Sequence, residues 1–230
     1  MTKYYKIFTS LILLTGFLVT TGLYSQTEES TFRTTGADIY SSYIWRGIKY
    51  GTGPAVQPVL EYTSGPFTAG AWGSFDFRGY QEVDLYLNYS FPSGFSFGIT
   101  DYYSPDLEYF DYSRATGSHA FELSIGISKN NFSFSANYIL NEAGGIGSTG
   151  NDLYFQADYS FKLFNLFIGA GNGWLTYEAD TGRNKFSICN LGFEVSRNIN
   201  ITDTFDIPVS GQLVFNPDQE QLFIVVGFTL

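Results

Sequence analysis

Apolar and polar side chains alternate one by one along most of the chain. Between residues 131 and 141 the apolar positions are Phe132, Phe134, Ala136, Tyr138 and Leu140, and mostly serine and asparagine fill the gaps. Successive side chains of a β-strand point to opposite faces, so this period of two predicts a strand with one apolar and one polar face. The mature chain is therefore expected to be all-β.

The same alternation recurs along the chain and predicts twelve strands. They cover about residues 35–46, 55–63, 67–77, 82–90, 94–103, 119–128, 132–140, 152–161, 164–175, 186–197, 205–215 and 221–230. We expect a transmembrane antiparallel up-and-down β-barrel of about twelve strands, within a range of ten to fourteen.

The connections between these strands alternate in length and chemistry. One set is mostly long and rich in Gly, Asp and Asn: Gly47–Pro54, Ser104–Ser118, Asn141–Asn151 and Thr176–Lys185. The other set is mostly short: Ser64–Pro66, Phe91–Ser93, Lys129–Asn131 and Lys162–Leu163. Membrane barrels have short turns at one rim and long loops at the other, which matches this alternation. Asn198–Thr204 is a longer turn than the rule prefers.

Composition decides which solvent the apolar face meets. Charged residues make up only 15% of the chain, whereas aromatic residues make up 19%. A secreted soluble sandwich or lipocalin-like barrel would carry many more charges on its polar face, so lipid contact is the favoured reading. Tyrosine and tryptophan near the strand ends would form an interfacial girdle: Tyr43, Trp45, Tyr62, Tyr89, Tyr102, Tyr138, Tyr159 and Trp174. Cys189 has apolar parity and is expected to face lipid.

The two ends of the chain point to export. Residues 1–25 read as a signal peptide because Lys3 and Lys6 precede an uncharged run; an N-terminal anchor is the alternative. The mature barrel would then be residues 26–230, in a bacterial outer membrane. The last strand alternates up to Leu230, so we expect the barrel-assembly machinery to read it. Outer-membrane lipid is the expected surrounding, and the oligomeric state stays open.

The formal net charge of −10 makes nucleic acid an improbable partner, because phosphate would be repelled. The single Cys excludes an intrachain disulfide and, with the single His, a Cys/His zinc site. We expect no metal site and no cofactor.

If the apolar face is outside, the other parity lines the lumen. The expected pore-lining residues are Asp38, Arg46, Glu61, Asp76, Arg78, Asp84, Glu122, Asp158, Glu194 and Asp206. Carboxylate rings favour cations, so a weakly cation-preferring passage for small hydrophilic solutes is predicted. The alternative is a plugged barrel in which these acids are solvated or pair with the two arginines. Arg46 itself would either contact solute or pair with an inward acid near the first loop.

Candidate chemistry outside the lumen is sparse. Asp106, Glu108 and Asp111 lie in the Ser104–Ser118 loop, which is a candidate for binding a ligand or a divalent cation. His119, the one histidine, follows this loop and is the only candidate general base. No Gly-x-Ser-x-Gly motif is present, so no enzymatic activity and no catalytic residue are predicted. A non-conducting barrel that binds a partner through its outer loops is the competing function.

Ser41-Ser42-Tyr43-Ile44-Trp45-Arg46-Gly47-Ile48, followed by Gly53-Pro54-Ala55-Val56-Gln57-Pro58, resembles the opening of the TorF-like porin family. The similarity continues through 67–77 and 82–89 and then thins to a shared strand rhythm. The family often has Asp where this chain has Ser42. The resemblance implies a porin-like outer-membrane channel and does not identify the solute.

Overall fold

The computed structural model describes residues 31–33, 36–176, 184–202 and 205–230. The predicted signal peptide and part of the Thr176–Lys185 loop lie outside them. Twelve strands form the barrel wall: β2 (Ala37–Tyr40), β5 (Ala55–Ser64), β6 (Phe67–Asp76), β7 (Gln81–Ser90), β8 (Phe95–Tyr103), β9 (His119–Lys129), β10 (Phe132–Ile139), β13 (Leu153–Ser160), β14 (Asn165–Gly171), β15 (Ser187–Thr202), β16 (Phe205–Asn216) and β17 (Gln221–Thr229).

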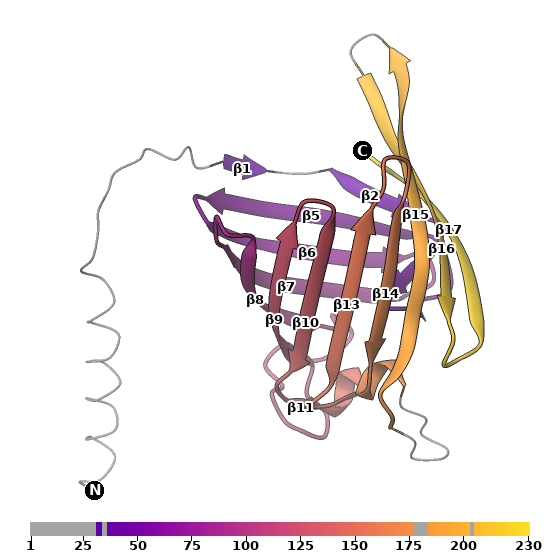
Figure 1. Ribbon diagram of the computed structural model, residues 1–230. Helices are drawn as coiled ribbons and strands as arrows, with labels where there is room; N and C mark the ends of the chain where they lie inside the picture. The colour runs from indigo at the N-terminus through magenta and orange to yellow at the C-terminus, as the bar shows by residue number, and fades with distance from the viewer. Residues whose placement is uncertain (1–30, 34–35, 177–183, 203–204) are drawn as a thin grey trace, which may run out of the picture.

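All neighbouring wall strands pair antiparallel, and nearly every strand pairs with the next one along the chain (Figure 1). β2 pairs with β5 on one side and with β17 on the other, which closes the sheet into a barrel. The predicted all-β, twelve-stranded barrel is confirmed. A short strand, β1 (Thr31–Arg33), pairs antiparallel with residues 61–63 of β5, which β2 does not reach.

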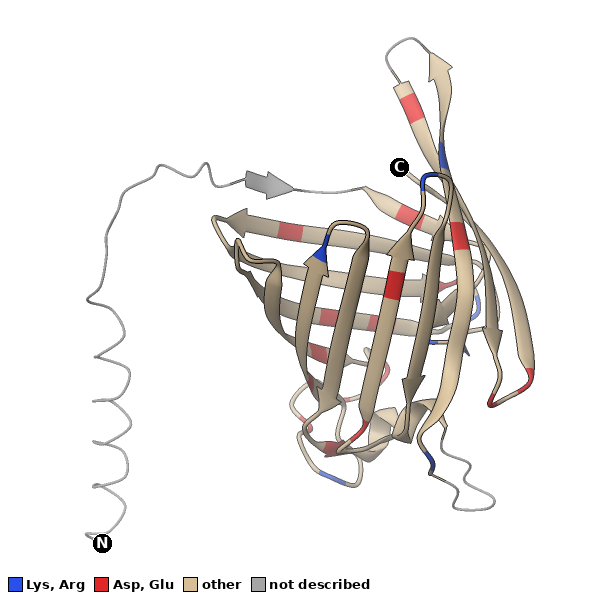
Figure 2. Ribbon diagram, in the orientation of Figure 1, with Lys and Arg blue, Asp and Glu red and all other residues tan. Residues whose placement is uncertain are grey.

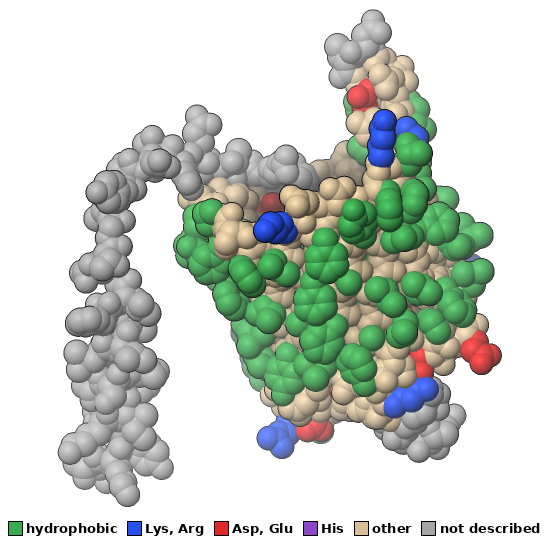
Figure 3. Space-filling model, in the orientation of Figure 1, with side chains coloured by type: hydrophobic (Ala, Val, Ile, Leu, Met, Phe, Trp, Pro, Cys, Tyr) green, Lys and Arg blue, Asp and Glu red, His purple; other side chains and the backbone are tan. Residues whose placement is uncertain are grey.

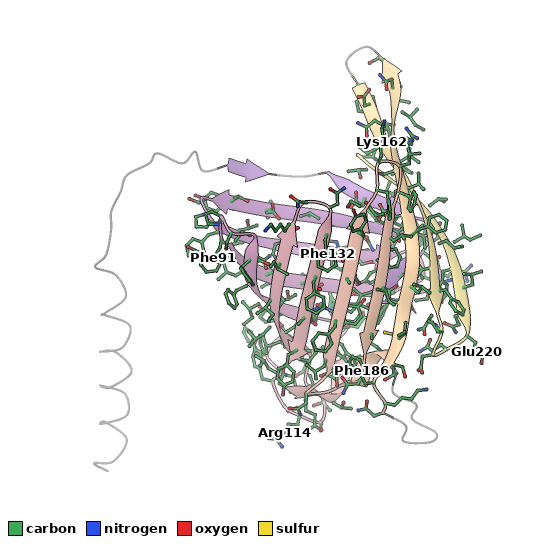
Figure 4. All side chains as sticks on the ribbon, viewed as in Figure 1. Phe91, Arg114, Phe132, Lys162, Phe186 and Glu220 are labelled. Carbon is green, nitrogen blue, oxygen red and sulfur yellow. The ribbon has the colours of Figure 1, made fainter. Side chains whose placement is uncertain are left out.

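Turns and loops separate to the two rims as the sequence predicted. In Figure 4, Phe91, Phe132 and Lys162 mark the short-turn rim, whereas Arg114, Phe186 and Glu220 lie toward the loop rim. Two departures concern strand length. The expected turn at 198–204 is largely strand, and β15 and β16 project beyond the short-turn rim because Ile199 pairs with Ile207. The expected strand 164–175 ends at Gly171, and Gly173–Leu175 forms the 3-10 helix η2.

The apolar face of the strands points outward. On β7, Leu85 and Leu87 are 46% and 47% exposed, whereas Asp84, which directly precedes Leu85, is 7% exposed. Figure 3 shows hydrophobic side chains covering the visible wall, and in Figure 2 most of that wall carries no charge. This is the reverse of a soluble barrel, which buries its apolar face.

The first predicted strand, 35–46, is broken. β2 ends at Tyr40, and the chain bends at Ser41 and Ser42 away from the wall. β3 (Tyr43–Trp45) and β4 (Ile48–Tyr50) then pair as a hairpin around Arg46 and Gly47. We call residues 43–50 the lumen hairpin, for the contacts described below. The predicted outer loop 47–54 is therefore partly hairpin.

The departure of the chain leaves a seam in the wall. β17 pairs with β2 only over Gly227–Thr229, and the last wall contact is the Ser41 N–H donating to the Val226 carbonyl at 2.8 Å. Toward the loop rim, no described residue pairs with that edge of β17. The lumen hairpin stands behind the seam, where Ile48, Lys49, Gln221 and Phe223 line a cavity of about 380 Å³.

The remaining elements lie at the loop rim. β11 (Glu142–Ala143) pairs with β12 (Ser148–Thr149), and the 3-10 helix η1 (Gly144–Ile146) connects them. Among the described residues, helices of membrane-spanning length and apolarity are absent.

Candidate functional site

The tip of the lumen hairpin is a two-residue turn. Arg46 and Gly47 both have positive φ, at 51° and 84°, and Trp45 pairs with Ile48 across the turn. Positive φ at both central residues is the signature of a type I′ turn, the connection that suits the twist of a two-residue hairpin. A side chain at Gly47 would have its Cβ 1.9 Å from the Cys189 carbonyl oxygen, so glycine is required.

Arg46 is fixed by charge and by aromatic rings. Its Nη1 and Nη2 donate to the two carboxylate oxygens of Glu122 at 2.6 and 2.8 Å. Its Cζ lies 4.3 Å from the centre of the Trp45 ring and 4.4 Å from that of Tyr154. The guanidinium thus makes a bidentate ion pair on its edge and cation–π contacts on its faces. The sequence left open whether Arg46 contacts solute or pairs with an inward acid, and in the structure it pairs with the inward acid Glu122.

Contacts of the lumen hairpin reach opposite parts of the wall. The Tyr43 ring lies 5.4 Å from that of Trp72 on β6, and the Asn216 side chain on β16 donates to the Gly47 carbonyl at 3.1 Å. With Arg46 bound to β9, the hairpin is tied to three well-separated strands. The lumen is therefore crossed and narrowed by the chain's own first hairpin.

Aromatic side chains expected in an interfacial girdle instead pack inside. Trp45 is 5.5 Å from Tyr102 and 6.1 Å from Trp174 between ring centres, and Tyr102 is 6.0 Å from Trp174. Tyr43 is 7% exposed. The girdle prediction is wrong for these four residues, because the lumen hairpin supplies an inner surface on which they are buried.

A cavity of about 160 Å³ opens between this aromatic group and β7. Its lining includes Trp45, Tyr50, Tyr80, Glu82, Tyr102 and Trp174. We call it the aromatic cavity. Tyr80 donates its hydroxyl proton to a Glu82 carboxylate oxygen at 2.7 Å. Sequence reasoning missed Glu82, although it shares the parity of Asp84 on the same strand and could have been found from that.

Asp84 stands next to Glu82 on the inward row of β7. It is 7% exposed, and within the described part of the chain its Oδ1 has no hydrogen-bond partner. Glu122, also inward, already holds Arg46. The inner wall beside the hairpin therefore carries two carboxylates, Glu82 and Asp84, beyond the one that Arg46 neutralises.

A third cavity, of about 200 Å³, lies at the base of the lumen hairpin, where the chain leaves the wall. Polar groups dominate its lining, with Ser42, Gln57 and Gln212 among them. The hairpin thus has a polar cavity at its base and the aromatic cavity near its tip.

The other predicted lumen residues divide into two groups. Glu61 accepts a hydrogen bond from the Tyr86 hydroxyl, Asp158 from the Gln156 amide, and Asp38 from the Thr229 hydroxyl. Glu194 is half-buried on β15. These four lie along the wall, apart from the aromatic cavity.

Three predicted lumen residues are misplaced. Arg78 is exposed in the β6–β7 turn at the loop rim, so it cannot oppose acids in the lumen. Asp76 closes that same rim by accepting backbone N–H groups from Thr52, Arg78 and Tyr80. Asp206 is exposed and pairs with Asn200 in the part of β15 and β16 that projects beyond the short-turn rim (Figure 1). Their strand parity was not enough to give their depth along the barrel.

Cys189 is a further correction, because it is fully buried and not facing lipid. The pairing of β14 with β15 shifts between Gly169 and Ala170, which pair with Asn190 and Ile188 and leave Cys189 as the extra residue. A bulge of this kind reverses the parity of the strand. Ile188 therefore points outward at 46% exposure, and Cys189 lies against Gly47.

The acids of the Ser104–Ser118 loop serve the loop itself. Asp111 accepts hydrogen bonds from the Thr116 hydroxyl at 2.7 Å and the Ser113 N–H at 2.9 Å, and these bonds lower its pKa. Asp106 and Glu108 are both exposed. Within the described ranges no set of three or more His, Cys, Asp and Glu residues has metal-binding geometry.

His119 is buried under this loop on the outer face of the barrel. Its Nδ1 is 2.9 Å from Asp101 Oδ1, and its Nε2 faces the Tyr109 carbonyl oxygen at 2.5 Å. Tyr103 and Tyr112 stack on the imidazole ring. Both ring nitrogens are engaged, so the arrangement offers no free nitrogen to a substrate and holds the loop on the wall.

A family profile described as "Bacterial protein of unknown function (Gcw_chp)" matches residues 25–207. No curated protein sequence matches the chain. Among solved structures, one mutant porin of Rh. blastica is 9% identical at a TM-score of 0.39, over 76% of this chain and 55% of that one. A second mutant of the same porin is 11% identical at a TM-score of 0.33, over 87% and 99%. The present chain therefore spans about half the length of the first porin. At these identities the barrel assignment rests on the sheet topology of this chain itself.

Proposed function

The chain belongs to the bacterial Gcw_chp family, whose function is unknown, and we propose that it is a porin-like outer-membrane barrel for passage of small hydrophilic solutes, with a weak preference for cations. The observation that carries the proposal is the lumen hairpin. It narrows a barrel with an apolar outside and a polar, acid-bearing inside, so that only small solutes would pass.

Three features support this function. The outward apolar face suits a lipid bilayer. The inward row of β7 presents Glu82 and Asp84 beside the hairpin, and carboxylates in a narrow lumen attract cations. The opening sequence that resembles TorF-like porins, from Ser41 to Pro58, contains the lumen hairpin itself. In this proposal the motif is the constriction of the channel. The barrel serves transport and not catalysis.

Single-channel recording of the refolded mature chain in a planar bilayer tests this function. We expect small discrete openings and, under a KCl gradient, a reversal potential of cation-selective sign. The matched variant replaces Tyr43–Tyr50 with two glycines, which should raise the conductance several-fold by removing the constriction. Silence from the correctly folded natural protein would overturn passage, and anion selectivity would overturn the role of the acids.

A non-conducting barrel that acts through its loops is the second candidate. The observation that favours it is the anchoring of the lumen hairpin on β6, β9 and β16, which ties the obstruction to the wall at several points. It predicts no openings in the natural protein and openings in the hairpin-deleted variant. The same recordings thus separate the two functions.

A further inference from the structure

We propose that the aromatic cavity is a binding site for a small organic cation, of the alkylated ammonium class. The inference goes beyond passage of solutes, because binding in this cavity does not require the barrel to conduct. It rests on three properties of the cavity: the chemistry of its walls, the charge around it and its size.

The walls are faces and edges of aromatic rings from separate elements. Trp45 and Tyr50 come from the lumen hairpin, Tyr102 from β8 and Trp174 from η2. Ring centres of neighbouring members lie 5.5–6.1 Å apart, as in Trp45–Tyr102 and Trp45–Trp174. Aromatic cages of this kind recognise quaternary ammonium groups through the negative potential of the ring faces.

The same aromatic group already holds one cation. The guanidinium of Arg46 lies 4.3 Å from the Trp45 ring centre. Both carboxylate oxygens of Glu122 are occupied by that guanidinium, so the ion pair leaves little net charge of its own. A second cation in the cavity would therefore contact aromatic rings of the same group, and the charge of Arg46 would repel it little because Glu122 neutralises that charge.

Carboxylates supply the attraction that a cation needs. Glu82 lines the cavity, and Asp84 follows it on the inward row of β7. Asp84 is 7% exposed and its Oδ1 has no hydrogen-bond partner among the described residues. A buried carboxyl group is stable either protonated or beside a positive charge, and a cation bound in the cavity would supply that charge. The electrostatics of the cavity thus favour a cation over a neutral or anionic ligand.

Size and wall chemistry narrow the class of cation. The volume of about 160 Å³ is well below the ~300–1,000 Å³ of pockets for drug-sized ligands, so only a few heavy atoms fit. A hard divalent cation takes roughly six to eight oxygen ligands, whereas this lining is mostly aromatic carbon. An alkylated ammonium group matches both the size and the walls.

Tryptophan fluorescence gives a direct test, because Trp45 and Trp174 line the cavity and the chain has only one other tryptophan. The full mature chain, refolded in octyl glucoside, is titrated with choline chloride at constant ionic strength. The parallel titration uses 3,3-dimethylbutan-1-ol, which has the same shape without the charge. We expect a saturable change with choline and at least about tenfold weaker binding of the alcohol, as expected for a desolvated cation–π site.

Glu82→Gln is the decisive variant, since it keeps the shape of the side chain and removes its charge. Choline affinity should fall about tenfold, whereas Glu220→Gln, which removes a charge in the β16–β17 turn, should leave it unchanged. Equal binding of choline and the alcohol, no saturable signal in the folded protein, or full affinity in Glu82→Gln would each overturn the proposal. The assay needs no conductance, so failure of passage and failure of binding are distinguished.

Discussion

Arg46 at the tip of the lumen hairpin and Glu122 on β9 form a bidentate ion pair between residues 76 positions apart in the chain. The side chains are 12% and 4% exposed. This pair joins the first hairpin of the barrel to the wall across the lumen. The tip also contacts β15 and β16 through Gly47. The ion pair and the turn together therefore hold the lumen hairpin across the lumen.

Arg46→Ala should destabilise the folded barrel strongly. Removing one partner of a buried ion pair leaves the other charge uncompensated, which costs about 3–5 kcal/mol. Urea-induced unfolding in lipid vesicles measures the change in the free energy of unfolding. The control is Arg78→Ala, whose exposed side chain lies in a rim turn, with an expected effect of about 0.5 kcal/mol or less. Equal effects of the two substitutions would contradict the buried pair.

A double-mutant cycle with Glu122→Gln refines this prediction. If the two side chains act as a pair, Arg46→Ala and Glu122→Gln together should cost clearly less than the sum of the single changes. Additive costs would show that Arg46 is held by Trp45 and Tyr154 alone.

Gly47→Ala should also disturb the hairpin, for a steric reason. Its φ of 84° disfavours other residues, and a Cβ there would overlap the Cys189 carbonyl oxygen. The expected cost is about 1–3 kcal/mol in the same unfolding assay, typical of backbone strain at such positions. Gly53→Ala is the matched control, because no atom lies within 4 Å of a Cβ placed there. A Gly47→Ala barrel as stable as the control would place the tip away from β15.

Local periodicity was enough to predict the wall strands, because each strand's own residues alternate between apolar and polar. The lumen hairpin could not be predicted in this way. Tyr43, Ile44 and Trp45 continue an apolar run, and only Gly47 marks a turn. Arg46 adopts positive φ without local preference for it, and its conformation is held by Glu122 in a distant strand. Whether residues 43–50 form a turn or continue the wall strand is therefore decided by contacts with distant residues, which the local sequence does not reveal.

The same reason explains the errors at Cys189 and Arg78. The bulge that turns Cys189 inward lies where Gly47 meets the wall, so it depends on the hairpin that the local pattern did not reveal. Arg78 has inward parity but sits beyond the end of β6. Parity gives the face of a residue, whereas its depth requires the exact strand ends. Glu82 at the aromatic cavity was reachable from parity, but its aromatic partners were not.

Cys189 should become reactive when the lumen hairpin is removed. In the folded barrel it is fully buried, so we expect little labelling by a water-soluble maleimide. Replacing Tyr43–Tyr50 with two glycines uncovers the inner wall and should raise the labelling rate at least about tenfold, since thiols react through their exposed thiolate form. A cysteine facing lipid would stay unreactive in both proteins. A control cysteine at Ser113, in the exposed loop, should react equally in both.

The Ser104–Ser118 loop should keep its shape until acid protonates Asp111. Hydrogen bonds from Thr116 and Ser113 lower the pKa of this carboxyl below its ordinary value of 3.8. Because its pKa is lower in the folded state, Asp111 stabilises the loop fully at pH values above its ordinary pKa. This stabilisation is lost as the pH falls through the lowered pKa of the folded state. The Ser113 amide proton, followed by NMR, should therefore titrate with a midpoint below pH 3.8. Thr116→Ala removes the hydroxyl donor and should move that midpoint upward. Asp111→Asn should abolish this titration, and a midpoint above 3.8 in the unchanged protein would contradict the loop geometry.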